Sequence, residues 1–215
     1  MSNTVSPVRE PETGDLIDRL AGIAPGSPLD AVRAQRPEAR ANAQSSYEAL
    51  FGGHGGAGAE AMGAVERFAV AAFVAGLNQE PAAAEYYAGQ LRERESAVAE
   101  AVADELAAAR TSGPYGNYPP GPLSHESRDG LRYAVGSAAA EVLGSRLGAA
   151  VEHAHLLVFR PREATPGALQ RLLDAGWSTD GIVTLSQLIS FLNFQVRVVA
   201  GLRLLRPADQ ITERH

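Results

Sequence analysis

Apolar residues recur at helical spacing along most of the chain, and they are densest towards its C-terminal end. A helix that begins after the N-cap candidates Ser178 or Thr179 carries apolar residues at 3-4-3-4-3 spacing, which places them on one face: Ile182, Leu185, Ile189, Leu192, Val196 and Val199. A second apolar row lies on another face: Leu188, Phe191, Val198, Leu202 and Leu205. We therefore expect this helix to be buried on several sides.

Four polar residues of the same helix form a narrow stripe within about 40° on the helical wheel: Ser186, Ser190, Asn193 and Arg197. One interpretation is a solvated strip. The other is a seam that faces a cavity or a subunit interface, because small hydroxyls, one amide and an Arg without an acidic partner differ from an ordinary charged surface. On the second interpretation, Asn193 and Arg197 are candidate ligand-binding residues.

The remaining apolar segments are also helical in period, and none shows the alternating Val, Ile or Thr pattern of a strand. Proline, N-cap and glycine signals predict helices over residues 15–20, 37–51, 59–77, 81–110, 137–143, 145–159 and 165–175, with a further start at Ser27 and Pro28. The expected fold class is all-α, a helical bundle on which the short N-terminal helices form a cap.

The length and the composition indicate one domain over residues 15–205. Residues 1–14 are polar with two prolines and predict a disordered N-terminal arm, and residues 206–215 form a tail. Residues 52–58 are rich in glycine and predict a flexible linker. Residues 112–130 hold several Pro and Gly and cannot continue a helix, so we expect a lid, an intersubunit arm or a disordered loop.

The charged residues limit the possible partners and chemistry. All 19 basic residues are Arg, so lysine Schiff-base chemistry and a P-loop lysine are excluded. The formal net charge of −6 and the lack of a basic run argue against nucleic acid and membrane partners. The chain has no cysteine and no apolar segment after Met1 that resembles a signal, so a soluble cytoplasmic protein is expected. No cofactor is predicted.

Glu66 is one candidate catalytic residue, because it lies in line with apolar residues of the predicted helix 59–77. The apolar neighbours at i+4, i+7 and i+11 are Val70, Phe73 and Leu77. The carboxylate either marks the edge of an amphipathic face or is a buried acid with a raised pKa that is available for proton transfer.

The segment VEHAHLLVF brings two histidines close together in the sequence. His153 and His155 are two positions apart, so on a helix their rings point about 200° apart and cannot share one ion; no metal site is predicted. Glu152 and His155, at i and i+3, are better placed for a hydrogen-bonded pair of acid and imidazole. His155 is therefore a candidate catalytic residue, with a purely structural histidine as the alternative.

The C-terminal pattern resembles a known family. The turn AGWSTDGIV at 175–183 between two helices, and the helix ending SFLNFQVRVVAGL at 190–202, are similar to the C-terminal half of carboxymuconolactone decarboxylase and AhpD-like proteins. In the peroxidase-related branch this region tends to read "aGls.eeI…fnf.nRv..gl". The resemblance covers roughly residues 45–205. It implies an AhpD-like helical bundle that assembles as a homo-oligomer, in the form of a dimer, trimer or hexamer.

The segment ERFAVAAFVAGLN, followed by a helix with EYY, resembles the family motif "ErE.ia.avs.lNgCxYCxxxH". In AhpD-like peroxidases that motif supplies a redox cysteine pair and a proton-relay Glu and His. When the two Leu-Asn pairs are aligned, the cysteine positions fall on Glu80 and Ala83, the His on Tyr87 and the relay Glu on Phe68.

A second register matches Glu66 to the relay Glu of the family, and it places the other motif positions on Asn78, Pro81 and Glu85. Neither register contains a thiol, and the chain has none to offer. Thiol peroxidase chemistry needs a thiolate nucleophile, so it is closed to this chain.

Two classes of function remain open. The first is a cofactor-free acid/base enzyme that acts on a small carboxylated lactone or a related ring compound. The second is a non-catalytic oligomeric or ligand-binding relative. The candidate catalytic residues are Glu66, Glu80, Glu85, Tyr87 and His155, and the candidate binding residues are Tyr86, Asn193 and Arg197. The acids near the start of helix 81–110 also have a simpler interpretation, because acids favour a helix N-terminus.

Overall fold

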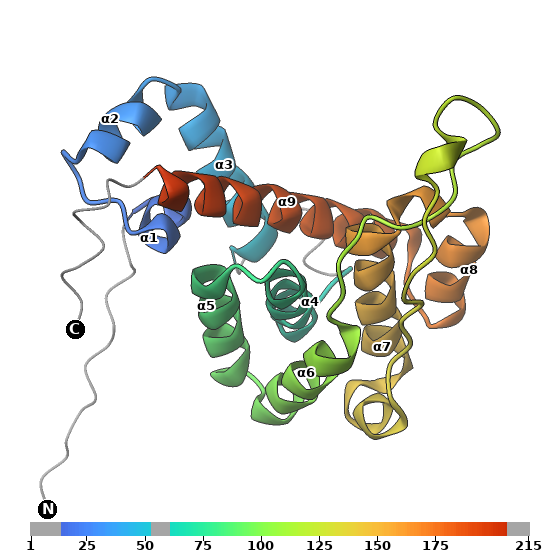
Figure 1. The fold of residues 1–215 in the computed structure, drawn as a ribbon. Coiled ribbons are helices and arrows are strands. Elements are labelled where there is room, and N and C mark those ends of the chain that lie inside the picture. The colour runs from blue at the N-terminus through green and yellow to red at the C-terminus, as the bar shows by residue number, and fades with distance from the viewer. Residues whose placement is uncertain (1–13, 53–60, 206–215) are drawn as a thin grey trace, which may run out of the picture.

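The computed structural model describes residues 14–52 and 61–205, and in these residues the fold is all-helical, as predicted (Figure 1). The helices are α1 (Leu16–Ala21), α2 (Pro28–Ala34), α3 (Pro37–Phe51), α4 (Ala64–Leu77), α5 (Pro81–Arg92), α6 (Ser96–Ala109), α7 (Ser137–Phe159), α8 (Pro166–Asp174) and α9 (Thr179–Leu204), with short 3-10 turns η1 (Ser124–Glu126) and η2 (Pro161–Glu163). The described residues contain no strand, only one isolated bridge between Gly116 and Arg128.

The helix starts follow the capping signals in the sequence. Ser27 Oγ accepts the N–H of Asp30, and Ser178 Oγ accepts the N–H of Gly181. These bonds satisfy backbone donors that have no partner within the helix. Proline occupies an early position of α2, α3, α5 and α8, where its missing N–H removes no helical hydrogen bond.

Helix α4 is the centre of the fold. Every residue from Arg67 to Leu77 is buried, and α3, α5, α6, α7 and α9 all contact this helix. Figure 1 shows α9 lying across α4, with α5 and α6 on the other side. Small side chains permit the close approach: a Cβ at Gly76 would lie 2.6 Å from the side chain of Leu106 in α6.

Helix α9 buries the predicted apolar face, with Leu185, Leu192 and Val199 fully inaccessible to solvent. Its neighbours are α1, α3, α4, α7 and α8. Helices α1, α3 and α8 therefore cover part of α9 within one chain. Val183 and Phe194 stay exposed. Among the described helices, α9 is long and apolar enough to cross a membrane, but half of its most apolar window is buried inside the fold.

The prediction of one continuous helix over 81–110 is wrong. The chain leaves the helix after Arg92 and resumes at Ser96. The break lets both α5 and α6 pack against α4, which one straight helix could not do. No Gly or Pro marks it. The helix predicted from residue 59 begins at Ala64, and residues 59–60 lie outside the described part.

Gly144 divides α7 into the two predicted segments, 137–143 and 145–159. Its φ of 68° and ψ of 171° are not helical. Glycine adopts this backbone conformation without strain, whereas residues with a Cβ are strained in it. The glycine therefore redirects the chain between the two parts of α7.

The loop over 112–130 is anchored at its base. The N–H of Tyr115 donates to the carbonyl oxygen of Phe159 at 2.6 Å, and the guanidinium of Arg162 lies 3.7 Å from the ring centre of Tyr118. Its tip, around η1, projects away from the helices (Figure 1). The predicted arm 1–14 (apart from Gly14), most of the linker 52–58 and the tail 206–215 lie outside the described residues.

Candidate functional site

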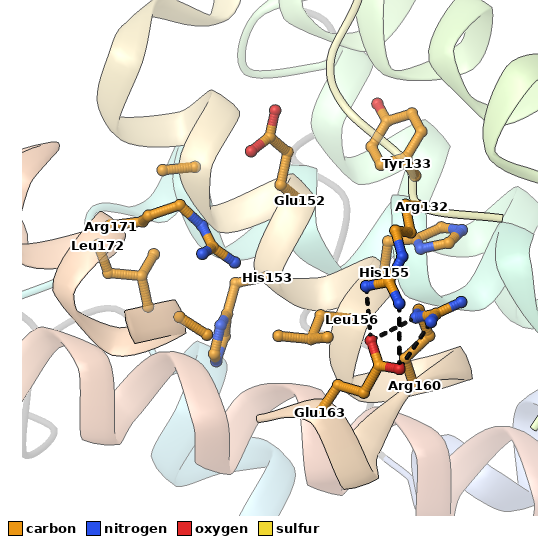
Figure 2. A pocket seen from close by; sticks show the side chains of 12 residues that line it. Arg132, Tyr133, Glu152, His153, His155, Leu156, Arg160, Glu163, Arg171 and Leu172 are labelled. Carbon is orange, nitrogen blue, oxygen red and sulfur yellow. Dashed lines mark hydrogen bonds and ion pairs between the residues drawn. The ribbon is translucent and has the colours of Figure 1, made fainter. Parts of the chain in front are cut away.

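A cavity of about 220 Å³ lies between α7 and α8, beside the segment that precedes α7 (Figure 2). The side chains that line it are Arg132, Tyr133, Ala149, Glu152, His153, His155, Leu156, Arg160, Glu163, Ala168, Arg171 and Leu172. Two imidazoles, two carboxylates and three guanidinium groups thus surround a space suited to a small polar molecule.

Most of these charges are already paired. Arg160 binds Glu163 through two bonds, Nε to Oε2 at 2.8 Å and Nη2 to Oε1 at 2.7 Å, and Arg132 adds a third at 2.8 Å. The hydrogen bond from Arg160 is the main reason that the pKa of Glu163 lies below its usual value. This cluster forms one end of the cavity, as the dashed lines in Figure 2 show.

Arg171 carries a positive charge that the described residues do not neutralise. Its guanidinium forms no ion pair with them, and its one hydrogen bond is a long one of 3.4 Å to the carbonyl oxygen of Gly167. The side chain is exposed at the wall of the cavity. It is therefore available to an anion.

His153 lies near Arg171 and also lines the cavity. The residue is only 5% exposed, and its ring makes no hydrogen bond with the described residues. Burial and, secondly, the charge of Arg171 lower its pKa. Figure 2 shows the ring and the Arg171 guanidinium on the same side of α7. The imidazole is thus neutral at pH 7, with ring nitrogens that are free to act on a ligand.

His155 has a structural role. Its Nε2 lies 3.0 Å from the carbonyl oxygen of Ala109, so this nitrogen carries the proton and donates. The ring packs against Tyr133 and Phe159, and burial lowers its pKa. The predicted pair of His155 with Glu152 is wrong. Oε1 of Glu152 accepts the N–H of Val135 at 3.0 Å instead, because that extended segment presents a backbone donor to the helix.

The two histidines face different parts of the cavity, as expected for i and i+2 on a helix. Figure 2 shows the rings of His153 and His155 on opposite sides of α7. Within residues 14–52 and 61–205, no group of three or more His, Asp or Glu side chains is placed to hold a metal ion.

Glu66 stabilises the start of α4. Its Oε2 accepts the N–H of Gly63 at 2.8 Å, and its Oε1 accepts Nε of Arg146 at 2.6 Å. The side chain is 19% exposed. Of the two interpretations offered by the sequence, the structure supports the edge of an amphipathic face, where the carboxylate ties α4 to α7.

Glu80 and Tyr87 are likewise engaged with other residues. Glu80 is the N-cap of α5; its Oε2 accepts the N–H of Ala83, and its Oε1 pairs with Arg203, both at 2.6 Å. This is the helix-start role that acids favour. The hydroxyl of Tyr87 donates to Oε1 of Gln195 at 2.6 Å inside the core.

Glu85 and Tyr86 line a separate hollow of about 600 Å³ between α1, α3 and α5. The hydroxyl oxygens of Tyr86 and Tyr47 lie 2.6 Å apart at its wall. The structure therefore does not gather Glu80, Glu85, Tyr86 and Tyr87 around one space.

Asn193 and Arg197 line a third cavity, of about 500 Å³, beside α9. Ser190 also lines it, whereas Ser186, the fourth residue of the polar stripe, does not. The two hydroxyls bond back along the helix: Ser186 Oγ donates to the carbonyl oxygen of Ile182, and Ser190 Oγ to that of Ser186.

Arg132, His153 and Arg171 are not among the candidate residues predicted from the sequence, which include His155 instead. His153 could have been preferred only by knowing that His155 faces a carbonyl of α6. No pattern in the sequence places Arg132, from the loop before α7, near α8.

Comparisons of the chain with protein-family models, with curated proteins and with solved structures find no match. The family resemblance therefore rests on the sequence patterns alone.

Proposed function

We propose that the protein is a cofactor-free acid/base enzyme that acts on a small carboxylated ring compound in the cavity between α7 and α8. The observation that carries the proposal is the juxtaposition of a neutral, unbonded His153 with the unpaired guanidinium of Arg171. The imidazole of His153 can act as a base towards a bound molecule, and the guanidinium of Arg171 can bind an anionic group of that molecule.

Each group has a defined task. Arg171 binds the carboxylate of the substrate, ideally through two parallel hydrogen bonds. A ring nitrogen of His153 removes a proton from the carbon next to the substrate's carbonyl group. The electron pair of the broken C–H bond moves to the carbonyl oxygen to give an enolate. If the ring also holds a carbon–carbon double bond next to that carbon, the imidazolium returns the proton to the far end of the extended enolate, so the double bond shifts and the net reaction is an isomerisation that consumes no other reactant. In a saturated ring the proton returns to the same carbon, and the only net change is exchange of hydrogen with the solvent.

The size of the cavity supports a small substrate. Its volume of about 220 Å³ lies below the range of roughly 300–1,000 Å³ typical of sites for drug-sized ligands. The resemblance to the carboxymuconolactone decarboxylase family supports a carboxylated lactone as the substrate class. Homo-oligomeric assembly and a cytoplasmic location are proposed on the same resemblance and on the absence of cysteine.

A second candidate is a non-catalytic, ligand-binding relative of the alkylhydroperoxidase-like proteins. This candidate is favoured by the bonds that Tyr87 and Glu80 make, because these residues stand where the family motif has its redox groups. Tyr87 and Glu80 are committed to Gln195 and Arg203, so these positions are part of the packed fold.

One experiment separates the two candidates. The probe is 5-oxotetrahydrofuran-2-carboxylate, a lactone with one carboxylate. Titration calorimetry measures its binding, and proton NMR in D₂O measures exchange of the hydrogens next to its carbonyl group. For an enzyme, we expect binding together with exchange that is faster than in buffer.

The variants assign the roles. Arg171→Gln should weaken binding by about tenfold or more, the equivalent of about 1.4 kcal/mol. His153→Gln should retain binding and lose the exchange. Arg36→Gln, an exposed arginine on α3's N-terminal side, is the control and should change neither. Binding without exchange in the wild type would favour the second candidate, and no binding would refute both.

A further inference from the structure

A groove beside α9 has the form of a second binding site, independent of the cavity between α7 and α8. Its volume is about 500 Å³, within the range of roughly 300–1,000 Å³ typical of small-molecule sites. The residues that line it are Asn78, Gly113, Pro114, Leu157, Val158, Phe159, Pro161, Ile189, Ser190, Asn193 and Arg197. They come from α9, from the end of α7, from η2, from the turn after α4 and from the start of the loop 112–130.

One side of the groove is apolar. Ile189 and Phe159 are buried beneath it, and Leu157 and Val158 are half-buried at its wall. Pro114 adds a ring that cannot donate a hydrogen bond. Water in such a place is replaced favourably by an apolar ligand, at roughly 25 cal/mol per Å² of apolar surface removed from solvent.

Two amides that fix each other also line the groove. Nδ2 of Asn78 donates to the carbonyl of Val74 at 2.9 Å and to Oδ1 of Asn193 at 3.2 Å. Nδ2 of Asn193 donates to the carbonyl of Ile189 at 2.9 Å. Because these bonds determine the orientation of the Asn193 amide, its Oδ1 is directed towards Arg197.

Arg197 is held next to these amides with its charge unpaired. Nη1 donates to the carbonyl oxygen of Asn193 at 2.7 Å and to its Oδ1 at 3.0 Å. The guanidinium forms no ion pair with the described residues, and its Nε and Nη2 make no hydrogen bond with them. Arg203, one helical turn and a half further on, is neutralised by Glu80 at 2.6 Å. Arg197 is therefore the unbalanced charge of the groove.

We propose that this groove binds a monocarboxylate with an apolar body. The apolar part lies over Ile189 and Phe159, and the carboxylate binds the free N–H groups of Arg197. Charge complementarity favours this ligand, because a fixed guanidinium beside an apolar wall matches an acid more closely than a neutral compound or a cation. In this proposal, Ser190, Asn193 and Arg197 of the polar stripe form the polar part of the binding site.

The test compares octanoate with octanol, which has the same chain length and no charge. Titration calorimetry should show octanoate binding at least about tenfold more tightly than octanol, with the difference shrinking at high salt. Arg197→Gln should remove that preference by weakening octanoate alone. Arg36→Gln, an exposed arginine far along the chain, should leave both affinities unchanged.

Two more variants locate the site. Ser190 is exposed at the groove, so Ser190→Trp should fill the space and abolish binding of both compounds without unfolding the helix, which circular dichroism checks. Arg171→Gln should leave octanoate binding intact. Equal binding of octanol and octanoate, or full octanoate affinity in Arg197→Gln, would overturn the proposal. If only Arg171→Gln lost octanoate binding, the acid would bind in the cavity between α7 and α8 instead. If the wild type bound neither compound and Ser190→Trp changed the oligomeric state, the groove would be a contact between subunits.

Discussion

Tyr87 of α5 donates its hydroxyl to Oε1 of Gln195 of α9 at 2.6 Å, and both side chains are fully buried. Burial is the main reason that the pKa of Tyr87 lies well above its usual value, so the phenol keeps its proton. Nε2 of Gln195 has no partner among the described residues. The bond thus joins two helices through an amide that is satisfied at one end only.

Tyr87→Phe should lower the free energy of unfolding by about 1–3 kcal/mol, because Oε1 of Gln195 would also lose its partner in the core. Urea unfolding followed by circular dichroism measures the change. Tyr86→Phe is the matched control: its hydroxyl contacts Tyr47 at the wall of a hollow, where water can replace it, so its effect should be smaller.

The double variant Tyr87→Phe with Gln195→Met should recover most of that loss. Replacing both polar partners by apolar groups of similar shape leaves no buried amide to satisfy. A double variant less stable than Tyr87→Phe alone would show that Gln195 has another role, such as binding a buried water molecule through Nε2.

Arg146 links the start of α4 to the turn before α9. Its side chain donates to Glu66 and to the carbonyl oxygens of Gly176 and Ala61, and its guanidinium lies 4.0 Å from the ring centre of Trp177. Arg146→Gln should destabilise the protein by about 2 kcal/mol, since hydrogen bonds from charged groups contribute more than neutral ones.

The same variant should change the fluorescence of Trp177, the one tryptophan of the chain. Arg162→Gln is the control, because Arg162 also lies over an aromatic ring, that of Tyr118, but at an exposed position. Its effect on stability should stay within about 0.5 kcal/mol. Equal effects of the two substitutions would contradict a structural role for Arg146.

Stability should fall as the solution becomes mildly acidic. Burial lowers the pKa of both His153 and His155, so in the folded protein they stay neutral at a pH where the unfolded chain, with a pKa of about 6.5, takes up protons. The stabilising difference is complete above pH 7 and is lost as the pH falls through the folded pKa values. The free energy of unfolding should change with pH by up to about 1.4 kcal/mol per pH unit for each histidine that titrates.

His153→Asn should reduce this slope while leaving the acid-induced loss below about pH 4, where carboxylates with lowered pKa values such as Glu163 take up protons. Guanidinium chloride unfolding at intervals between pH 5 and 8 measures the slope. An unchanged slope in His153→Asn would mean that His153 titrates alike in the folded and unfolded states.

Much of the fold could be predicted from local signals. Ser27, Gly144 and Ser178 mark boundaries because caps and left-handed glycines act through neighbouring backbone groups. The break between α5 and α6 could not be predicted, since the sequence at 93–95 has no breaker and the turn depends on packing against α4. The contacts of the candidate site residues were harder to predict than the fold. The partners of Glu66 and Glu80 are Arg146 and Arg203, which lie far away in sequence.

The protein should not reduce peroxides with dithiols as the reductant, because the chain contains no sulfur nucleophile to form the intermediate. A coupled assay with organic hydroperoxide, dithiothreitol and a metal-free preparation checks this prediction. Enzyme-dependent peroxide loss in stoichiometric proportion to thiol oxidation would contradict it.

The exposed side of α9 gives a direct test of self-association. Phe194 is 47% exposed and packs against half-buried Phe191, with ring centres 6.4 Å apart. Because most of α9 is covered within one chain, a charge at 194 should leave a monomer folded. If copies associate through this face, however, Phe194→Asp would bury an unpaired charge in the interface and should dissociate the assembly.

Light scattering at micromolar concentration distinguishes the cases. We expect the wild type to be an oligomer and Phe194→Asp to run as a folded species near 22.6 kDa. Gln187→Asp, an exposed position on the same helix, is the control for charge. Since it removes no aromatic side chain, its effect should be weaker wherever apolar contact drives association. A wild type that is itself a stable monomer would refute self-association, and an oligomer unaffected by Phe194→Asp would move the interface away from this face of α9.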